Sequence, residues 1–130
     1  MSFEADLQKF ARNVGKSLDE TCRAVAIRWF SDTVRSTPVD TGRLRGNWQY
    51  TRETPAIGEI DREDKTGSQV INEITTKVGG VGTVNYLTNN LEYAQRIENG
   101  SSRQAPRGMV RTNFVRIQRI IKQVAAGNQV

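Results

Sequence analysis

The chain has 130 residues and a mass of 14.6 kDa, enough for one hydrophobic core and therefore one domain. Its 19 Lys and Arg against 14 Asp and Glu give a formal net charge of +5, which permits contact with nucleic acid or an acidic partner without requiring either. The absence of histidine excludes a histidine general base and a histidine metal ligand. Hydrophobic residues make up only 36%, a low share that favours a subunit whose remaining surface is covered by neighbours.

No apolar run approaches the ~20 residues that a membrane-spanning helix needs. The first ten residues, MSFEADLQKF, lack the basic and then apolar pattern of a signal peptide. We therefore expect a protein that is made and used in a cytoplasm. The single cysteine, Cys22, cannot form an internal disulfide, and we interpret it as a core thiol.

Apolar residues recur every three or four positions through the first part of the chain, as in an amphipathic helix. They are Phe3, Leu7, Phe10, Val14, Leu18, Cys22, Val25 and Trp29. This spacing predicts one long helix over about 3–35, with Ser2 as its N-cap. At ~1.5 Å per residue such a rod is roughly 45–50 Å long, too long for a compact domain of this size. Either Gly15 kinks the helix, or part of its apolar stripe rests on a neighbouring subunit.

The twelve residues TPVDTGRLRGNW, at 37–48, join this helix to the rest of the chain. Pro38 disfavours helix in the residue before it, Asp40 and Thr41 favour a turn, and Gly42 can adopt a positive φ angle. We therefore expect a hinge over 37–46. Nothing in this segment is catalytic by itself, because its hydroxyl groups have no visible base.

Charged and aromatic side chains of the hinge suggest specific roles. We interpret Asp40 as an acceptor for backbone donors of the turn, paired with Arg43 or with an arginine of a neighbouring subunit. Arg43 and Arg45 point to opposite faces if the segment is extended. Trp48 heads an alternating pattern that predicts a strand over 46–53, and we expect its ring in the core rather than at an interface.

The middle of the chain predicts a small antiparallel sheet with short helices over 47–100. Charged residues without a period predict an exposed, mobile loop over 54–66. Helical spacing follows over 68–78, and β-branched and aromatic residues then predict a second strand over 82–89 that pairs with the first.

A short helix of two turns within EYAQRIENG, at 92–100, should end at Gly100. After a linker, apolar residues at steps of four and three predict a C-terminal helix over about 107–126, with Pro106 at its start. Together with the N-terminal helix, these elements predict an α+β fold.

Two segments taken together, 37–48 and YLTNNLEYAQRIENGSSRQAPRGMVR at 86–111, resemble a family of bacteriophage tail components. It is the family of long-tailed phages that includes the lambda-type minor tail protein Z, also described as tail completion or neck proteins. The residues that carry the resemblance are Pro38, Asp40, Thr41, Gly42, Arg43, Leu44, Tyr93, Ala94, Glu98, Gly100, Pro106, Met109 and Arg111. The chain departs from the family at Asn99, where an aromatic residue is usual, and at Arg107 and Gly108, where a more apolar pair is common.

The resemblance implies a structural protein of the virion rather than an enzyme, with no cofactor. Such a protein acts near the head–tail junction and helps to finish the tail tube or to make it competent to join the head. It is expected to form a ring, with six copies matching the tail symmetry. Its partners would be tail terminator, tail-tube or head-connector proteins, and it would assemble in the host cytoplasm.

Within this picture, Tyr93 should pack its ring and leave its hydroxyl for a polar partner. Glu98 should act as a cap, pair with Arg103 or Arg107, or bridge two subunits. A ring would also turn the basic residues of the C-terminal part into a basic annulus that attracts DNA without reading its bases. These residues are Arg103, Arg107, Arg111, Arg116 and Arg119; the alternative is a solvated helix face.

Two other classes of function were weighed against this one. A DNA-binding module would use the basic C-terminal helix, but the sequence lacks a helix-turn-helix spacing, a zinc signature and an aromatic-basic strand motif. An enzyme could hold a metal ion with Asp61, Glu63 and Asp64, but their loop lacks the pattern of a calcium-binding loop.

Overall fold

The computed structural model describes residues 2–100 and 108–125. Within these residues it contains six helices and two strands, which confirms the predicted α+β class. The helices are α1 (Phe3–Asn13), α2 (Leu18–Arg35), α3 (Arg43–Gly46), α4 (Ser68–Lys77), α5 (Ala94–Glu98) and α6 (Val110–Ala125), and the strands are β1 (Trp48–Arg52) and β2 (Asn85–Asn89).

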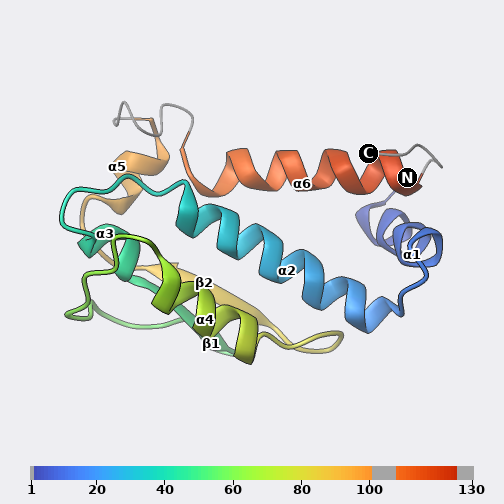
Figure 1. Ribbon diagram of the computed structural model, residues 1–130, viewed down its shortest axis with the longest axis horizontal. Helices are drawn as coiled ribbons and strands as arrows, with labels where there is room; N and C mark the ends of the chain where they lie inside the picture. Colours follow the sequence, from blue (N-terminus) through green and yellow to red (C-terminus); the bar gives the residue numbers. More distant parts are fainter. Residues whose placement is uncertain (1, 101–107, 126–130) are drawn as a thin grey trace.

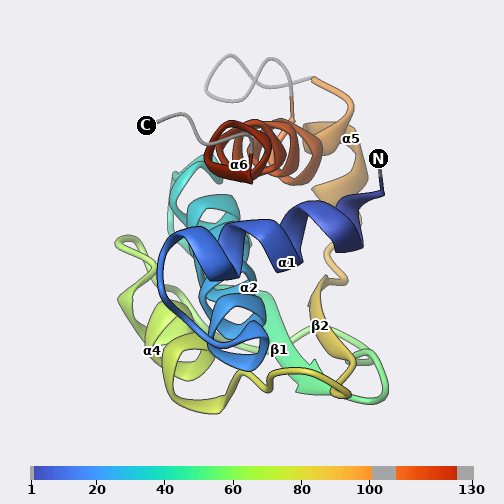
Figure 2. The same ribbon diagram turned by 90° about the vertical axis from the view of Figure 1, so that its right-hand side faces the viewer.

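The central element is α2, which runs through the middle of the molecule (Figure 1). On one side it is covered by α1 and α6, and on the other by α4 and the sheet; Figure 2 looks along α6 and shows α1 crossing below it. Val34 of α2 and Val70 and Ile74 of α4 are completely buried. The core therefore lies where α2, α4 and the sheet meet.

The predicted continuous helix over 3–35 is wrong, because the chain breaks between α1 and α2. Gly15 has a φ of 73°, and its N–H donates to Arg12 O while the N–H of Lys16 donates to Ala11 O. This is the Schellman hydrogen-bond pattern, in which the residue just after a right-handed helix adopts a left-handed conformation and ends the helix. The hydroxyl of Ser17 then accepts the N–H of Glu20 at 3.1 Å and caps α2.

The break lets α1 fold across α6 of its own chain. The rings of Phe3 and Phe114 lie 5.8 Å apart, and Phe114 also packs 4.7 Å from Trp29 of α2. Ala11 is only 3% exposed. The break at Gly15, one of the two alternatives expected, therefore packs part of the apolar stripe of α1 against its own chain.

The two predicted strands pair antiparallel, as expected, but both are shorter than predicted. Trp48 lies opposite Asn89 and Tyr50 opposite Leu87. Trp48 and Tyr50 are 5% and 9% exposed and face α2 and α4, so the alternation that predicted β1 also identified its buried face. The core position predicted for Trp48 is confirmed.

Two expectations for the connecting segments need correction. The hinge over 37–46 is not wholly irregular, because Gly42 takes a φ of 92° and one helical turn, α3, follows it. The loop over 54–66 has no helix or strand, as predicted, but it is not simply exposed. Asp64 is 4% exposed, and the N–H of Ile60 donates to Asn47 Oδ1 at 2.9 Å.

The remaining helices match their predictions within a few residues. Gly100, with a φ of 92°, ends α5 as expected, and its N–H donates to Ile97 O at 3.0 Å. The predicted C-terminal helix is seen as α6. The predicted start and end of this helix lie outside the described residues, which include neither Pro106 and Arg107 nor residue 126.

Candidate functional site

The hinge segment is held by Arg45, whose side chain turns inward from α3. Its Nη2 donates to the carbonyls of Arg35 and Thr37, at 2.9 and 2.7 Å, and its Nη1 to the carbonyl of Lys65 at 2.5 Å. The guanidinium thus lies at the C-terminal end of α2, where helix carbonyls carry partial negative charge. Burial lowers the pKa of Arg45, with Asp64 opposing the shift, but a guanidinium remains charged at neutral pH.

The loop before α4 clamps the same segment from the other side. Asp64 Oδ2 accepts the N–H groups of Gln69 and Val70 at 2.9 and 3.1 Å, so it caps α4, and its own N–H donates to Gly42 O. A Cβ on Gly42 would lie 2.7 Å from the backbone nitrogen of Lys65. Only glycine therefore fits at this position without a shift of the backbone.

Arg62 adds a second clamp from this loop. Its Nε donates to Gly46 O at 2.7 Å and its Nη2 to Trp48 O at 2.9 Å, while Nη1 pairs with Glu73 of α4. We call residues 37–48, together with the segment 58–67 that holds them, the turn unit. Three of its charged side chains, Arg45, Arg62 and Asp64, bind backbone groups.

Glu98 joins α5 to the start of α6. Its carboxylate accepts the N–H groups of Met109, Val110 and Arg111 at 2.7, 2.8 and 3.2 Å. Arg111 returns the contact through Nε to the carboxylate at 3.1 Å and through Nη2 to Glu98 O at 2.8 Å. Burial raises the pKa of Glu98, but the hydrogen bonds from Val110, Met109 and Arg111 outweigh it and place the pKa below its usual 4.5. Of the roles expected for Glu98, the structure shows the capping role; Arg103 and Arg107, its other expected partners, lie outside the described residues.

The structure brings the two motif segments together. Residues 38–44 line a hollow of about 140 Å³ with Tyr93 and Ile97, which come from the segment some fifty residues later. Tyr93 packs against the core cluster, as predicted for its ring. The residues that are separated in the sequence thus form one structural unit.

Other predicted residues of the motif are placed differently. Asp40 is exposed, and Arg43 pairs with Glu59 at 2.8 Å, so the predicted Asp40–Arg43 pair is wrong. The hydroxyl of Thr41 accepts the N–H of Arg43 at 3.2 Å and supports the turn.

Trp48 Nε1 donates to the buried hydroxyl of Thr37 at 2.8 Å, so this tryptophan has both its apolar and its polar group satisfied. Leu44 and Met109 are core residues, 5% and 1% exposed. Arg103, Pro106 and Arg107 lie outside the described residues.

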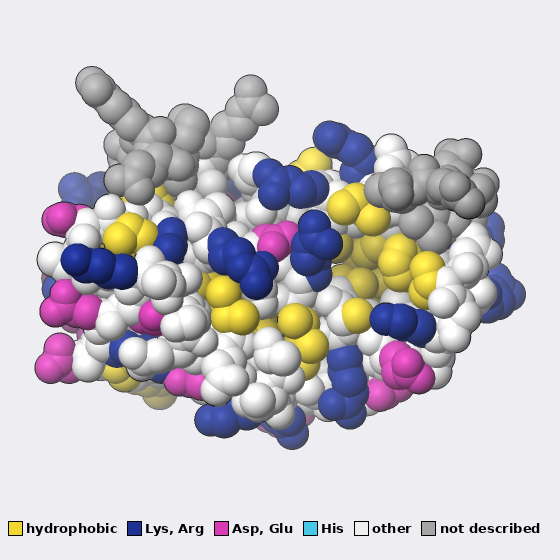
Figure 3. Space-filling view, in the orientation of Figure 1, with side chains coloured by type: hydrophobic (Ala, Val, Ile, Leu, Met, Phe, Trp, Pro, Cys, Tyr) yellow, Lys and Arg dark blue, Asp and Glu magenta, His cyan; other side chains and the backbone are white. Residues whose placement is uncertain are grey.

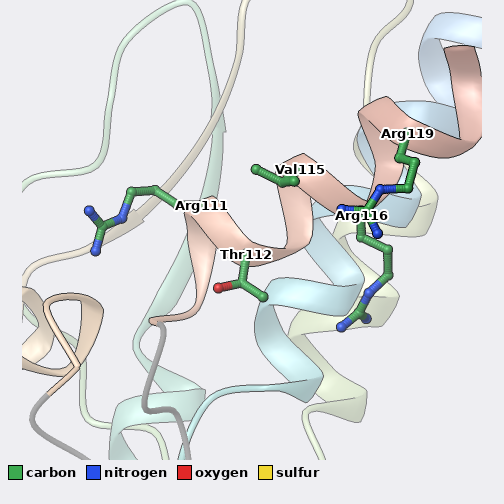
Figure 4. A pocket seen from close by; sticks show the side chains of 5 residues that line it. All are labelled: Arg111, Thr112, Val115, Arg116 and Arg119. Carbon is green, nitrogen blue, oxygen red and sulfur yellow. The ribbon is translucent and has the colours of Figure 1, made fainter.

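The outer face of α6 carries unneutralised positive charge. An open hollow of about 570 Å³ is lined by Arg111, Thr112, Val115, Arg116 and Arg119 (Figure 4). Lys122 lies further along the helix. Among the described residues, only Arg111 of these cations takes part in an ion pair. Arg116 Nη1 donates instead to Asn113 Oδ1 at 3.4 Å.

This charge is confined to one part of the sequence. Residues 99–130 contain six of the 19 Lys and Arg and none of the 14 Asp and Glu, which leaves 13 basic and 14 acidic residues in 1–98. The chain is thus close to neutral up to Glu98 and strongly basic after it.

Several residues of the turn unit were not identified from the sequence. Arg45, Arg62 and the cap role of Asp64 depend on carbonyls and helix ends that meet only in the fold. A capping signal was available for Asp64, since an aspartate shortly before a helix is typical of an N-terminus. Nothing in the sequence, however, distinguished it from the exposed acids Asp61 and Glu63.

The remaining titratable groups give no metal site or reactive thiol in the described part of the chain. Among residues 2–100 and 108–125, no group of three His, Cys, Asp or Glu residues is placed to hold a metal ion. Cys22 is half-buried on α2, and burial, together with the charge of Asp19, raises the pKa of its thiol. In the same residues no helix has the length and apolar character needed to cross a bilayer.

Comparison with known proteins found no match: no protein-family model, no curated protein and no solved structure matches the chain. Its function must therefore be inferred from its residues and their geometry.

Proposed function

We propose that the chain is a structural protein of a long-tailed phage virion that forms a ring, of six copies, at the head-proximal end of the tail. There it takes part in tail completion or head–tail joining, in contact with tail terminator, tail-tube or head-connector proteins. The observation that carries the proposal is the joint packing of the two segments that resemble the minor tail protein Z-like family. Residues 38–44 line one hollow with Tyr93 and Ile97, so the segments that carry the resemblance are neighbours in the fold, which supports the proposal.

The roles of the motif residues favour structural work. Gly42 allows close approach of the loop, and Glu98 caps the next helix. Trp48 and Met109 fill the core. These residues support the chain's own backbone and packing, which is what a rigid building block requires.

One expectation no longer supports the proposal. A long N-terminal helix would have needed a neighbouring subunit to cover it, but α1 packs on α6 of the same chain. The proposal therefore depends on the motifs and the turn unit and not on an uncovered helix.

The test is to delete the reading frame from the phage that carries it and to image the resulting particles. We expect full heads and finished-length tails that do not join, with joining restored when the wild-type chain is supplied in trans. Native mass spectrometry of the purified chain with its tail partners should also give a ring or a co-assembly. Normal joining without the protein, together with a chain that stays monomeric beside those partners, would refute the proposal.

A second function, non-specific DNA binding by α6, is favoured by the acid-free sequence after Glu98. It is also favoured by Arg119 and Lys122, which form no ion pair with any residue that the structure describes. Binding of duplex DNA by the free chain should then weaken steeply with salt. Arg119→Gln should reduce the slope of log K against log salt by about 1, whereas Lys77→Gln on α4 should leave it unchanged. No binding at low salt would remove this candidate.

A further inference from the structure

An apolar groove opens where α1, α2 and α6 meet. It is lined by Phe10 of α1, Ala24 and Val25 of α2, and Ile117, Ile120 and Ile121 of α6, and it has a volume of about 180 Å³. In Figure 3 hydrophobic side chains gather on the same side of the molecule, below α6. An apolar cavity of about 150 Å³ can hold a benzene-sized group, so this groove has room for one branched aliphatic side chain.

The edge of the groove between α2 and α6 is positively charged. Arg28, which lines it, and Arg35 share the single carboxylate of Asp32, at 2.7 and 3.3 Å. Arg116 lies one helical turn before Ile120 on α6 and takes part in no ion pair among the described residues; its side chain extends toward α2 in Figure 4. The groove therefore favours an apolar group that is accompanied by negative charge.

The chain itself presents such a group. Ile57 is 95% exposed, the most exposed large hydrophobic residue among those described. Its turn is anchored on both sides, because Asn90 Nδ2 donates to the carbonyls of Ala56 and Gly58, each at 3.0 Å, and Gln49 Nε2 donates to Gly58 O at 2.8 Å. A single exposed isoleucine is ordinary, but here it is held out from the surface by a fixed backbone.

The loop around Ile57 is acidic and so complements the positively charged edge of the groove. Glu53, Glu59, Asp61 and Glu63 are all exposed in the same loop. Among them Glu59 pairs with Arg43, and the others form no ion pair with a described residue. Ile57 is thus an apolar side chain within an acidic loop.

The two surfaces lie at opposite ends of the molecule. Figure 2 shows α6 at the top, α1 crossing below it, and the loop that follows β1 at the lower right. We infer that Ile57 of one copy inserts into the groove between α1, α2 and α6 of a second copy, with its acidic loop against Arg28 and Arg116. Because the contact joins different surfaces of the two copies it is heterologous, and such a contact closes into a ring when the rotation allows. The inference deepens the proposed function and rests on it for the closure of the ring.

The test is sedimentation velocity of the purified full chain over a range of concentrations. The wild type should self-associate, and more weakly as salt rises from about 0.05 M to 0.5 M, because exposed charges are screened. Ile57→Ser should weaken association by roughly tenfold or more, as expected when an aliphatic side chain is removed from a buried site. Its matched control, Val81→Ser, changes a valine that is 57% exposed outside both surfaces and should associate as the wild type does.

Ala24→Glu tests the groove with little risk to folding, since Ala24 is exposed on α2. It should abolish association by placing a negative charge where the acidic loop would dock, whereas Gln69→Glu, at an exposed position of α4, should not. The decisive experiment mixes Ile57→Ser with Ala24→Glu. Each is expected to be monomeric alone, but the mixture has one intact isoleucine and one intact groove and should give a 1:1 dimer that grows no further.

Three results would overturn the contact: a monomeric wild type at all concentrations, wild-type association by Ile57→Ser, or no dimer in the mixture. None of these three results tests the proposed function, which is tested separately by head–tail joining. A ring that persists in Ile57→Ser would reject this contact and keep the ring. Normal joining without the protein would reject the proposed function, whatever the chain does in solution.

Discussion

The turn unit and α6 use charged side chains in opposite ways. In the turn unit, Arg45 and Asp64 point inward and bind backbone groups at the ends of α2 and α4. In α6 the inner face is apolar, with Ile117 and Ile121 buried, while Arg119 and other cations point outward. The same residue type thus stabilises the fold in one region and remains available to a partner in the other.

This difference shows that the positive net charge of the chain comes from the residues after Glu98, among them the exposed cations of α6. The donors of Arg45 are engaged by backbone carbonyls of its own chain and are not available to a partner. The outward cations of α6 follow a region that is close to neutral. Substitutions that compare the two regions should therefore separate stability from binding.

The largest effect is expected from Trp48→Ala in the turn unit. It removes a ring that is 5% exposed and a hydrogen bond to Thr37, and it should lower the free energy of unfolding by about 3–5 kcal/mol. Phe114→Ala on α6 should cost roughly half as much, because that ring is only half-buried. Urea unfolding with unchanged m-values checks both, and equal losses would contradict the greater contribution expected from the more deeply buried Trp48.

Next in size is Gly42→Ala, for which Gly58→Ala is a matched control. Both glycines have a positive φ, at which alanine costs about 1–2 kcal/mol. At Gly58 a Cβ meets no atom within 4 Å, whereas at Gly42 it meets the backbone of Asp64 and Lys65. Gly42→Ala should therefore lower the free energy of unfolding by about 1–3 kcal/mol more than Gly58→Ala. Thermal unfolding of the two variants tests this, and equal shifts in Tm would show that the loop can move away.

Arg45→Gln and Arg119→Gln compare the two uses of arginine directly. Losing the bonds of Arg45 to Arg35, Thr37 and Lys65 should lower the free energy of unfolding by about 1.5–3 kcal/mol. Arg119→Gln should change it by no more than about 0.5 kcal/mol, because the side chain is exposed. A destabilised Arg119→Gln would mean that the α6 charge is structural.

The smallest effect is expected from Glu98→Gln, which weakens the cap of α6 by about 0.5–2 kcal/mol at pH 7. Because the folded-state pKa of Glu98 lies below its usual value, its carboxylate adds stability fully above pH 4.5. That stability should disappear as the pH falls through the lowered pKa, so wild type and variant should converge in acid. Chemical unfolding at several pH values measures this, with Glu92→Gln, an exposed glutamate of the same region, as the control. A difference independent of pH would exclude the carboxylate as its source.

The sequence predicted most of the elements because their patterns are local. Alternation identified β1 and its buried Trp48, and the steps of three and four residues identified α4 and α6. The break at Gly15 was one of two alternatives that the apolar pattern left open, although Ser17 and Glu20 have the spacing of a helix N-terminus. The apolar stripe runs past this break because Phe3 before it and Trp29 after it both pack against Phe114 of α6.

The sequence by itself determined the α+β class, the order of the elements and the charge of the last quarter, since period, turn residues and composition are properties of neighbouring positions. Only the tertiary structure decided that Arg45 and Asp64 would be engaged by helix ends, that Glu98 would cap α6, and that α1 would lie across α6. Each of these depends on backbone groups left unpaired at helix termini or on apolar faces that meet across the fold. The cap of α4 by Asp64 has a local signal, but the other contacts depend on how separate segments of the chain pack, so no local pattern identifies them.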